Sequence, residues 1–270
     1  MARHAALDLP WALDPEQLDR WLVPVRAGSV MLFLDYDGTL TPIVERPEQA
    51  RLAESTRALL ADLAARCAVT IVTGRDVTVV QRFVGLDTLG YAGSHGFDIV
   101  GPSGSGLRRE VARDCLPVLD RAEALLRSAL DDVEGVLVER KRFSVASHVR
   151  RVAPADRPRV EAAVAGVASG FPELRRGQGK AVHELRPNLL WDKGAAVSWL
   201  VRRMGGDLDA VVYFGDDLTD EDAFARLDGA GTAIVVTAED RPTSARLRLN
   251  DPEEVGVVLG RMLTAMPARR

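Results

Sequence analysis

The feature that most constrains this chain is a run of five apolar residues at 30–34 that stops at Asp35-Tyr36-Asp37-Gly38. An apolar run without polar alternation is typical of a strand buried on both faces, as in a parallel sheet covered by helices. Asp35 and Asp37 then follow the carboxyl end of this strand, which is the edge where ligands bind in open α/β sheets. A turn or a helix N-cap explains one carboxylate there, whereas two carboxylates and a glycine indicate a catalytic loop.

Further apolar runs predict three more buried strands, and the spacing of leucine and valine residues predicts helices between them. The predicted strands are 68–72, 210–214 and 233–236. The predicted helices are a short one that Asp14 caps, then 53–66, 76–83, 193–204 and 255–262. Strands and helices in alternation predict a parallel sheet with helices on both faces, so the fold class is α/β.

Two residues near the later strands are candidates for binding an anion. Thr73 follows the second predicted strand, and its hydroxyl group would lie beside Asp35 if the two strands are neighbours, as a βαβ crossover predicts. An N-cap for the helix at 76–83 explains Thr73 equally well. Lys193 lies in the first turn of a helix, where its charge opposes the helix dipole, so we expect it to be placed for an anion.

The most acidic stretch follows the strand at 210–214 and carries five acids within residues 216–222. Such a cluster is unfavourable unless a cation or a helix N-terminus offsets the repulsion, and we expect both. The later acids can start the helix that contains Phe224. Asp216 and Asp217 then remain for a metal ion.

Together the strand ends would place six polar residues at one edge of the sheet. Such a set is typical of Mg²⁺-dependent phosphoryl transfer. Asp35 would attack phosphorus and form an aspartyl-phosphate. Asp37 would protonate the leaving alcohol and then deprotonate the attacking water. Thr73 and Lys193 would hold the non-bridging phosphate oxygens as charge shifts in the transition state.

The middle of the chain has a different pattern. After the glycine-rich hinge at 101–106 we predict a helix at 110–130, a strand pair within 136–150, a helix at 156–168, and a second strand pair whose turn is 177–179. This αββαββ unit would have an open sheet, apolar on one face and charged on the other. A charged face is usually only solvated, but this one would also suit a hydroxyl-rich ligand. Its charged residues are Glu139, Lys141, His148, Arg150, Lys180 and Glu184.

Composition argues against other classes of function. A net charge of −4 argues against a nucleic-acid-binding protein. Cys67 and Cys115 lack metal-ligand spacing and indicate free thiols in a reducing compartment. No stretch reaches the roughly 18 apolar residues of a membrane span, and the first residues lack a signal-peptide pattern. We therefore expect a cytoplasmic monomer that acts on a small molecule, with neither nucleic acid nor membrane as a partner.

Four sequence motifs, taken in order, resemble those of the haloacid-dehalogenase-like phosphatases. They are Asp35-Tyr36-Asp37-Gly38-Thr39-Leu40, Thr73-Gly74-Arg75, Lys193 and Gly215-Asp216-Asp217. More narrowly, further segments within roughly residues 30–240 look like the trehalose-6-phosphate phosphatase family. These are Gly93-Ser94-His95-Gly96, Glu139-Arg140-Lys141, His148-Val149-Arg150, Glu184-Leu185-Arg186-Pro187, Trp191-Asp192-Lys193-Gly194 and the acidic stretch from Gly215 to Phe224.

The resemblance implies a Rossmann-like core, residues 1–107 and 188–270, with an inserted α+β cap, 108–187, that closes over a sugar. It implies hydrolysis of trehalose 6-phosphate with Mg²⁺, the last step of trehalose biosynthesis. The metal ion would be held by Asp35, by the backbone carbonyl of Asp37 and by Asp216, with Asp217 and Asp220 acting mainly through water or neighbouring groups. The implied substrate-binding residues are His95, Glu139, Lys141, Arg150, Lys180 and Glu184.

Three alternatives stay open at this point. The same chemistry on sucrose phosphate or glucosylglycerol phosphate would differ only in the cap residues. A sugar phosphomutase shares the aspartate nucleophile and a similar cap but requires a bisphosphate activator. A catalytically inactive sensor of sugar phosphate could keep the pocket for binding alone, although a sensor has no need of a nucleophile at Asp35.

Overall fold

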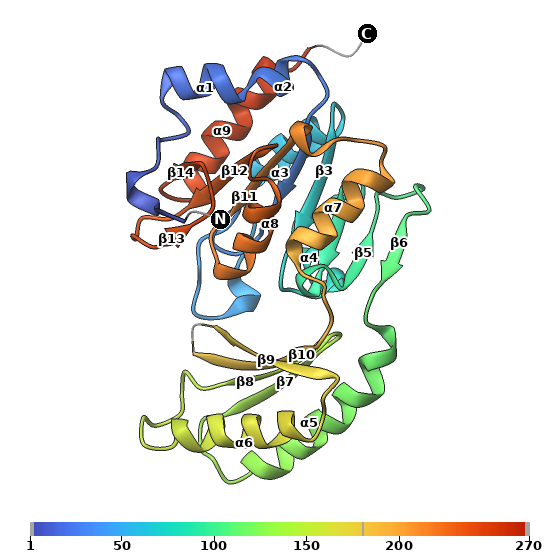
Figure 1. Ribbon diagram of the computed structural model, residues 1–270, viewed down its shortest axis with the longest axis vertical. Coiled ribbons are helices and arrows are strands. Elements are labelled where there is room, and N and C mark those ends of the chain that lie inside the picture. The colour runs from blue at the N-terminus through green and yellow to red at the C-terminus, as the bar shows by residue number, and fades with distance from the viewer. Residues whose placement is uncertain (1–2, 180, 268–270) are drawn as a thin grey trace. The chain divides into compact units, whose positions relative to one another are not determined.

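The computed structural model describes residues 3–179 and 181–267, which fold as two compact units (Figure 1). The first unit runs to Arg109 and resumes at Trp191, and the second unit is Glu110–Leu190. The second unit therefore interrupts the first in the sequence. The predicted insertion has slightly different bounds, 108–187, and its role as a cap stays a prediction.

The first unit is built on an eight-stranded sheet. In spatial order its strands are β14 (Leu247–Leu249), β12 (Thr232–Val236), β11 (Val211–Gly215), β2 (Met31–Leu34), β3 (Ala68–Val72), β4 (Gly90–Gly93), β5 (Asp98–Val100) and β6 (Arg108–Glu110). The strands from β14 to β4 are parallel, whereas β5 runs antiparallel to β4. The predicted α/β fold class is confirmed, with the difference that the sheet is mixed.

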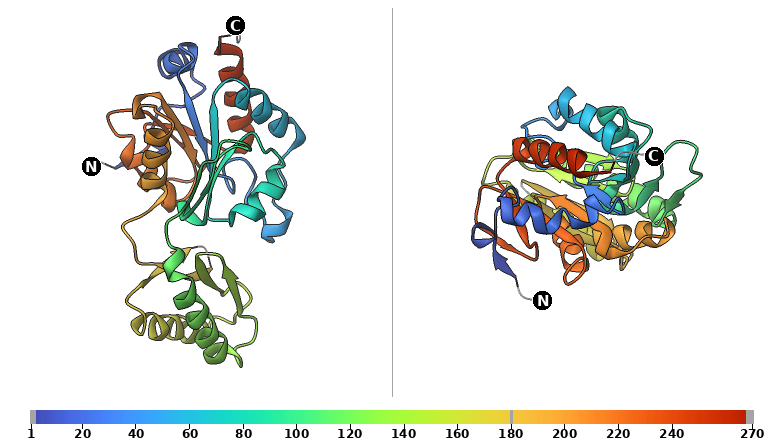
Figure 2. Two further views of the ribbon diagram at one scale, coloured as in Figure 1. Left: turned by 90° about the vertical axis from the view of Figure 1, so that its right-hand side faces the viewer. Right: turned by 90° about the horizontal axis from the view of Figure 1, so that it is seen from above.

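Helices cover both faces of this sheet, as the views in Figure 2 show. On one face lie α3 (Glu54–Ala64), α4 (Val77–Val84) and α9 (Pro252–Ala265), and on the other lie α7 (Lys193–Arg203) and α8 (Glu221–Arg226). Leu32 and Leu34 of β2 pack into the first of these two cores, and Phe33 packs into the second. All three side chains are fully buried, which explains why this strand has no polar alternation.

The N-terminal segment packs against the same unit. The carboxylate of Asp14 accepts hydrogen bonds from the amides of Glu16 and Gln17, which confirms the predicted cap of α1 (Pro15–Trp21). The short helix α2 (Val23–Arg26) leads from α1 towards β2. Nearer the N-terminus, β1 (His4–Ala5) pairs with β13 (Pro242–Thr243), so this segment is tied to the loop that follows β12.

The second unit is a four-stranded antiparallel sheet with two helices on one face, in the predicted αββαββ order. Its elements are α5 (Leu116–Leu130), β7 (Leu137–Lys141), β8 (Ser144–His148), α6 (Arg157–Ser169), β9 (Leu174–Gly179) and β10 (Val182–Pro187). Val138, Val145 and Leu185 of the sheet are buried in one core with side chains of both helices. The other face of the sheet therefore carries the residues that alternate with these three.

Two local predictions in this region are wrong. The helix predicted at 110–130 begins only at Leu116, because β6 ends at Glu110 and a short 3-10 turn at Arg113–Cys115 precedes the helix. The turn predicted at 177–179 lies within β9, which stays paired with β10 as far as Gly179. A Cβ atom on Gly177 would lie 2.7 Å from a guanidinium nitrogen of Arg186, so this glycine makes room for a side chain and not for a turn.

Several short strands were absent from the prediction. They are β1, β4, β5, β6, β13 and β14. β4 begins and ends with glycine, so it lacks the apolar run that marks the other core strands. A Cβ atom on Gly90 would lie 2.7 Å from the hydroxyl oxygen of Thr70 on β3, so close packing between the strands explains the glycine.

Candidate active site

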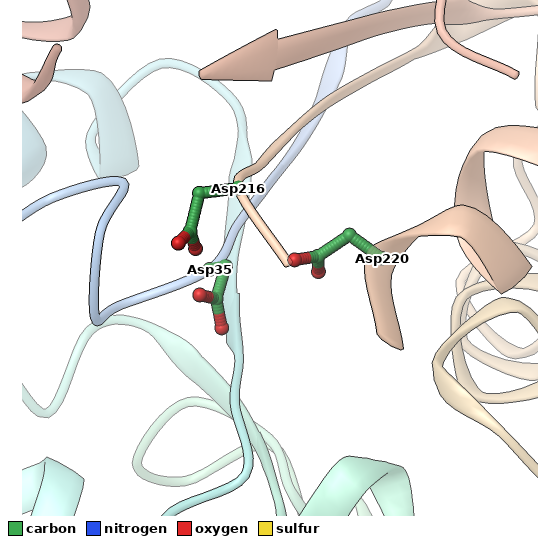
Figure 3. Close-up of side chains that lie close together, drawn as sticks. All are labelled: Asp35, Asp216 and Asp220. Carbon is green, nitrogen blue, oxygen red and sulfur yellow. The ribbon is translucent and has the colours of Figure 1, made fainter. Parts of the chain in front are cut away.

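Three aspartates meet at the carboxyl edge of the core sheet. Asp35 follows β2, Asp216 follows β11, and Asp220 directly precedes α8. Because β2 and β11 are paired in parallel, both strands end at the same edge. One carboxylate oxygen from each aspartate lies within 4.8 Å of the other two, and Figure 3 shows how the side chains converge.

Lys193, the first residue of α7, brings positive charge to this cluster. Its Nζ atom lies 3.0 Å from Oδ1 of Asp35 and 2.7 Å from Oδ1 of Asp220. The lysine is only 2% exposed, and a buried ammonium group needs such partners. The sequence predicted that Lys193 is placed for an anion. In this structure the anions that it contacts are carboxylates of the protein itself. Three carboxylates nevertheless share this one ammonium group.

Burial and mutual repulsion change the acidity of these groups. Burial raises the pKa of Asp35 to about 7, although the charge of Lys193 acts in the opposite direction. Burial, together with the charges of Asp35 and Asp220, raises the pKa of Asp216 to about 9. Burial opposes the charge on Lys193, but Asp220 and Asp35 outweigh it and raise the pKa of the ammonium group. The cluster therefore has an unfavourable excess of negative charge when it is ionised.

The donor set fits a small, hard divalent cation. Oδ1 of Asp216 is buried and accepts no hydrogen bond from the described residues. Both oxygens of Asp220 already accept hydrogen bonds, Oδ1 from Lys193 and from the hydroxyl of Tyr213, and Oδ2 from the amide of Asp217. Asp35 and Asp216 are therefore the carboxylates with oxygen atoms to offer, while Asp220 holds Lys193 in place. Mg²⁺ typically takes one or two carboxylates and fills its other positions with water and substrate phosphate.

Gly38 allows the loop after β2 to approach this cluster. Its φ angle is +86°, which lies in the left-handed region, and a Cβ atom there would lie 2.1 Å from Oδ2 of Asp216. A side chain at position 38 would therefore displace the carboxylate of Asp216. The glycine in the Asp35-Tyr36-Asp37-Gly38 sequence thus has a steric reason that the sequence alone does not reveal.

The side chain of Asp37 lies outside the three-aspartate group and pairs with Arg75. Nε and Nη2 of Arg75 each lie 2.6 Å from one of the two carboxylate oxygens of Asp37. Nη2 also donates to the carbonyl of Pro47, and the guanidinium group lies over the rings of Tyr36 and Phe83. The guanidinium group therefore holds the carboxylate of Asp37 in one place. Our sequence reasoning assigned no role to Arg75, although it belongs to the Thr73-Gly74-Arg75 motif.

Thr73 lies at the same edge, one residue past β3, the neighbour of β2. It is buried, and its hydroxyl oxygen accepts a hydrogen bond from the amide of Arg75 at 3.2 Å. The alternative role as the N-cap of α4 is wrong, because Asp76 occupies that position. The contribution of Thr73 to phosphate binding stays a prediction.

His95 lies in a strained turn beside Thr73. Ser94 and His95 both have positive φ angles, 49° and 58°, which are unfavourable for residues other than glycine. The amide of His95 donates to the carbonyl of Thr73, and a Cβ atom on Gly74 would lie 2.8 Å from the imidazole ring. Backbone strain of this kind is common at functional sites. The predicted contact of His95 with the substrate stays a prediction.

Asp217 is exposed and does not belong to the three-aspartate group. Its amide donates to Asp220, so the residue helps to shape the turn before α8. The predicted roles of Asp37 and Asp217 as metal ligands stay predictions. Asp220 was not among the predicted catalytic or metal-binding residues, although the family resemblance implied that it acts through water or neighbouring groups.

The second unit gathers polar side chains on the face of its sheet that the helices leave open. Oε1 of Glu184 accepts a hydrogen bond from the hydroxyl of Ser144 at 2.7 Å and lies 3.5 Å from Nζ of Lys141. Nε2 of His148 lies 2.8 Å from Oε2 of Glu139. These contacts follow from the strand register, which places Lys141 opposite Ser144 and Glu184 opposite Ala146.

Arg150 is exposed in the turn after β8, beyond the end of the strand. Lys180 lies outside the described residues. Sugar binding by either residue stays a prediction.

Comparison with known proteins identifies the family. Residues 33–253 match the model of the family described as trehalose-phosphatase. A probable trehalose-phosphate phosphatase D from Arabidopsis thaliana is 41% identical over 88% of this chain and 68% of its own length. The chain belongs to the trehalose-phosphatase family. Membership indicates a phosphatase enzyme.

Other relatives agree with this assignment. A trehalose-phosphate phosphatase from Mycobacterium marinum is 41% identical over 87% of this chain, which spans 62% of that relative's length. The C-terminal domain of trehalose-6-phosphate phosphatase from C. albicans has a TM-score of 0.79 at 25% identity, covering 95% of this chain and 98% of that one. A haloacid-dehalogenase-like hydrolase from Bacteroides thetaiotaomicron shares the fold, with a TM-score of 0.65 at 14% identity over 86% of this chain and 99% of that one.

Proposed function

We propose that this protein hydrolyses trehalose 6-phosphate to trehalose and inorganic phosphate with the help of Mg²⁺. The observation that carries the proposal is the buried group formed by Asp35, Asp216 and Lys193 at the carboxyl edge of the sheet. A nucleophilic carboxylate, an ammonium group and an unpartnered carboxylate oxygen are what phosphoryl transfer through aspartate requires. The family and the relatives support the choice of substrate.

In the first half of the reaction, a carboxylate oxygen of Asp35 attacks phosphorus and the bond to the sugar oxygen breaks. Asp37 donates a proton to the departing oxygen, and its own carboxylate is then stabilised by Arg75. In the second half, Asp37 takes a proton from a water molecule as that water attacks phosphorus. The bond to Asp35 breaks, which releases inorganic phosphate and restores the free carboxylate.

The remaining groups of the site would stabilise the negative charge of the phosphoryl group. Lys193 and the hydroxyl of Thr73 would hold the non-bridging oxygens of the phosphoryl group. Mg²⁺, when bound to Asp35 and Asp216, would neutralise the phosphate and favour the ionised form of both carboxyl groups. The backbone carbonyl of Asp37 and the side chain of Asp217 are further proposed ligands.

The second unit would supply specificity for the sugar. Glu139, Lys141 and Glu184 offer hydrogen-bond acceptors and donors of both signs on one face of its sheet, which suits the hydroxyl groups of a disaccharide. Arg150, Lys180 and His95 complete the proposed set. Because these residues alone decide among sugars, phosphates of sucrose or glucosylglycerol are the nearest alternative substrates.

The proposed setting is the cytoplasm, and the proposed state is a monomer with a sugar phosphate as its partner. None of the helices within 3–179 and 181–267 combines the length and hydropathy that crossing a membrane would need.

The test is phosphate release by the purified protein with Mg²⁺, using trehalose 6-phosphate, sucrose 6-phosphate and glucose 6-phosphate, with EDTA as the metal-free control. We expect strong preference for the first substrate and no release with EDTA.

Asp35→Asn should abolish turnover, because an amide is a poor nucleophile. Residual turnover within about tenfold of the wild type would rule out Asp35 as the nucleophile. Release only after a sugar bisphosphate is added would favour the phosphomutase.

A further inference from the structure

A largely buried ion pair between Arg241 and Glu221 joins α8 to the loop that follows β12. Nη1 of Arg241 lies 2.7 Å from Oε1 of Glu221, and the side chains are 18% and 5% exposed. Oε2 of Glu221 accepts a hydrogen bond from the amide of Ser244 at 2.7 Å. Glu221 is the first residue of α8 and follows Asp220 directly. The pair therefore fixes the start of that helix to the loop that contains Arg241.

The same guanidinium group also reaches the main chain at the end of β11. Nη2 of Arg241 donates a hydrogen bond of 2.9 Å to the backbone carbonyl of Asp216. A planar guanidinium group that binds two acceptors at once sets their relative position more rigidly than a single ammonium group can. Arg241 thus links Asp216, which lies before the turn that carries Asp220, to Glu221, which lies after it.

The loop that holds Arg241 is itself anchored to the N-terminal segment. The amide of Ala6 donates to the carbonyl of Arg241 at 2.9 Å, and β1 pairs with β13 directly after Arg241. Ala6 is fully buried, so this contact is part of the core and not a surface contact. Arg241 therefore has a supported backbone from which its side chain can hold the main chain of Asp216.

We propose that Arg241 and Glu221 are positioning residues for the metal ion. They hold the main chain of Asp216 so that its unpartnered Oδ1 atom stays directed at the cation, and they touch neither the substrate nor the metal. This inference rests on the proposed function in one respect, namely that Asp35 and Asp216 hold a divalent cation. Residues that orient metal ligands in this way typically change metal affinity by about 10- to 100-fold.

The experiment is calorimetric titration of Mg²⁺ into the full-length protein without substrate, for the wild type and for Arg241→Met. We expect the Mg²⁺ dissociation constant of Arg241→Met to rise by about 10-fold or more. Turnover at saturating Mg²⁺ should stay within about threefold, because the variant leaves Asp35, Asp37 and Lys193 unchanged. Arg241→Lys should give an intermediate affinity, because an ammonium group keeps the charge but lacks the planar fork that fixes the positions of two acceptors.

The matched control is Arg246→Met, which removes another arginine from the same loop. Arg246 pairs with Asp228, and its side chain is 56% exposed. We expect no change in Mg²⁺ affinity for this control. If Arg241→Met fails to fold, Glu221→Gln takes its place, because the amide keeps the size of the side chain and removes its charge.

A purely structural role would lower the melting temperature of the variants and leave their Mg²⁺ affinity unchanged. A dissociation constant for Arg241→Met within twofold of the wild type would therefore overturn the inference, and so would a wild type that does not bind Mg²⁺. The titration contains no sugar phosphate. A wild type that binds Mg²⁺ but does not hydrolyse trehalose 6-phosphate would contradict the proposed substrate, while the comparison of Mg²⁺ affinities would still decide the role of Arg241.

Discussion

At the scale of single residues, the ion pair between Arg75 and Asp37 connects the geometry of the site to its chemistry. Both carboxylate oxygens of Asp37 bind the guanidinium group, which lies over two aromatic rings. This is the state that Asp37 would have after it has given up a proton and before it takes one from water. Arg75 would thus stabilise the product of the proton transfer, which matters most when the leaving oxygen is strongly basic.

Arg75→Met should therefore lower turnover of trehalose 6-phosphate by about 10- to 100-fold. Turnover of p-nitrophenyl phosphate should fall by less than about threefold, because nitrophenolate leaves without needing a proton. The measurement is kcat/KM for both substrates at saturating Mg²⁺, because this constant reports the first half of the reaction, whereas the second half is the same for both substrates. Arg82→Met is the control, because Arg82 is exposed near the end of α4. Equal losses on the two substrates would contradict the role assigned to Arg75.

At the scale of elements, the ends of strands and helices decide where charges meet. α7 illustrates this, because the carboxylate of Asp192 accepts a hydrogen bond from the amide of Ala195 and caps the helix. The helix therefore starts at Lys193, and its first residue is directed to Asp35 and Asp220. In the second unit, the register of β8 and β10 brings Ser144 and Glu184 together in the same manner.

If this polar face binds the sugar, Glu184→Ala should lower kcat/KM for trehalose 6-phosphate by at least about 10-fold, since it removes a charged hydrogen-bond acceptor. The same change should alter kcat/KM for p-nitrophenyl phosphate by less than about threefold, because that ester has no sugar. Glu161→Ala serves as the control, since Glu161 is exposed on α6. Similar losses on both esters would mean that this face of the sheet is not a sugar site.

At the scale of the whole molecule, the buried carboxyl groups make stability depend on pH and on metal. The pKa values of Asp35 and Asp216 in the folded protein are about 7 and about 9, above the ordinary aspartate value of 3.8. Between pH 4 and those values the folded protein binds more protons than the unfolded chain, so its stability falls as pH rises. The stability that the protonated carboxyl groups of Asp35 and Asp216 contribute is fully present below about pH 4. It is lost as the pH rises through about 7 and then about 9.

The metal-free protein should therefore have a lower melting temperature at pH 9 than at pH 5, by at least about 3 °C, which corresponds to roughly 1 kcal/mol. Asp216→Asn should raise the melting temperature of the metal-free protein at pH 9 and change it little at pH 5, because the amide carries no charge. Mg²⁺ should stabilise the wild type at pH 9 more than it stabilises Asp216→Asn. An equal effect of Asp216→Asn at both pH values would show that charge at this residue does not limit stability.

The sequence by itself determined the features that depend on neighbours along the chain. The apolar run before Asp35 identified a strand buried on both faces, and the cap at Asp14 marked a helix start that the structure confirms. The strand-end motifs and the further short segments of adjacent residues resembled the family whose model matches residues 33–253. Local pattern failed where a glycine served packing, as Gly177 does in β9.

Only the tertiary structure decided which distant residues meet. The partner of Asp37 is 38 positions away at Arg75, and the group that holds the carbonyl of Asp216 is 25 positions away at Arg241. Such contacts depend on strand order, on register and on the path of each loop, none of which has a local signal in the chain. A charged side chain lowers its energy by pairing wherever the fold brings an opposite charge, so sequence can name the charges but not their partners.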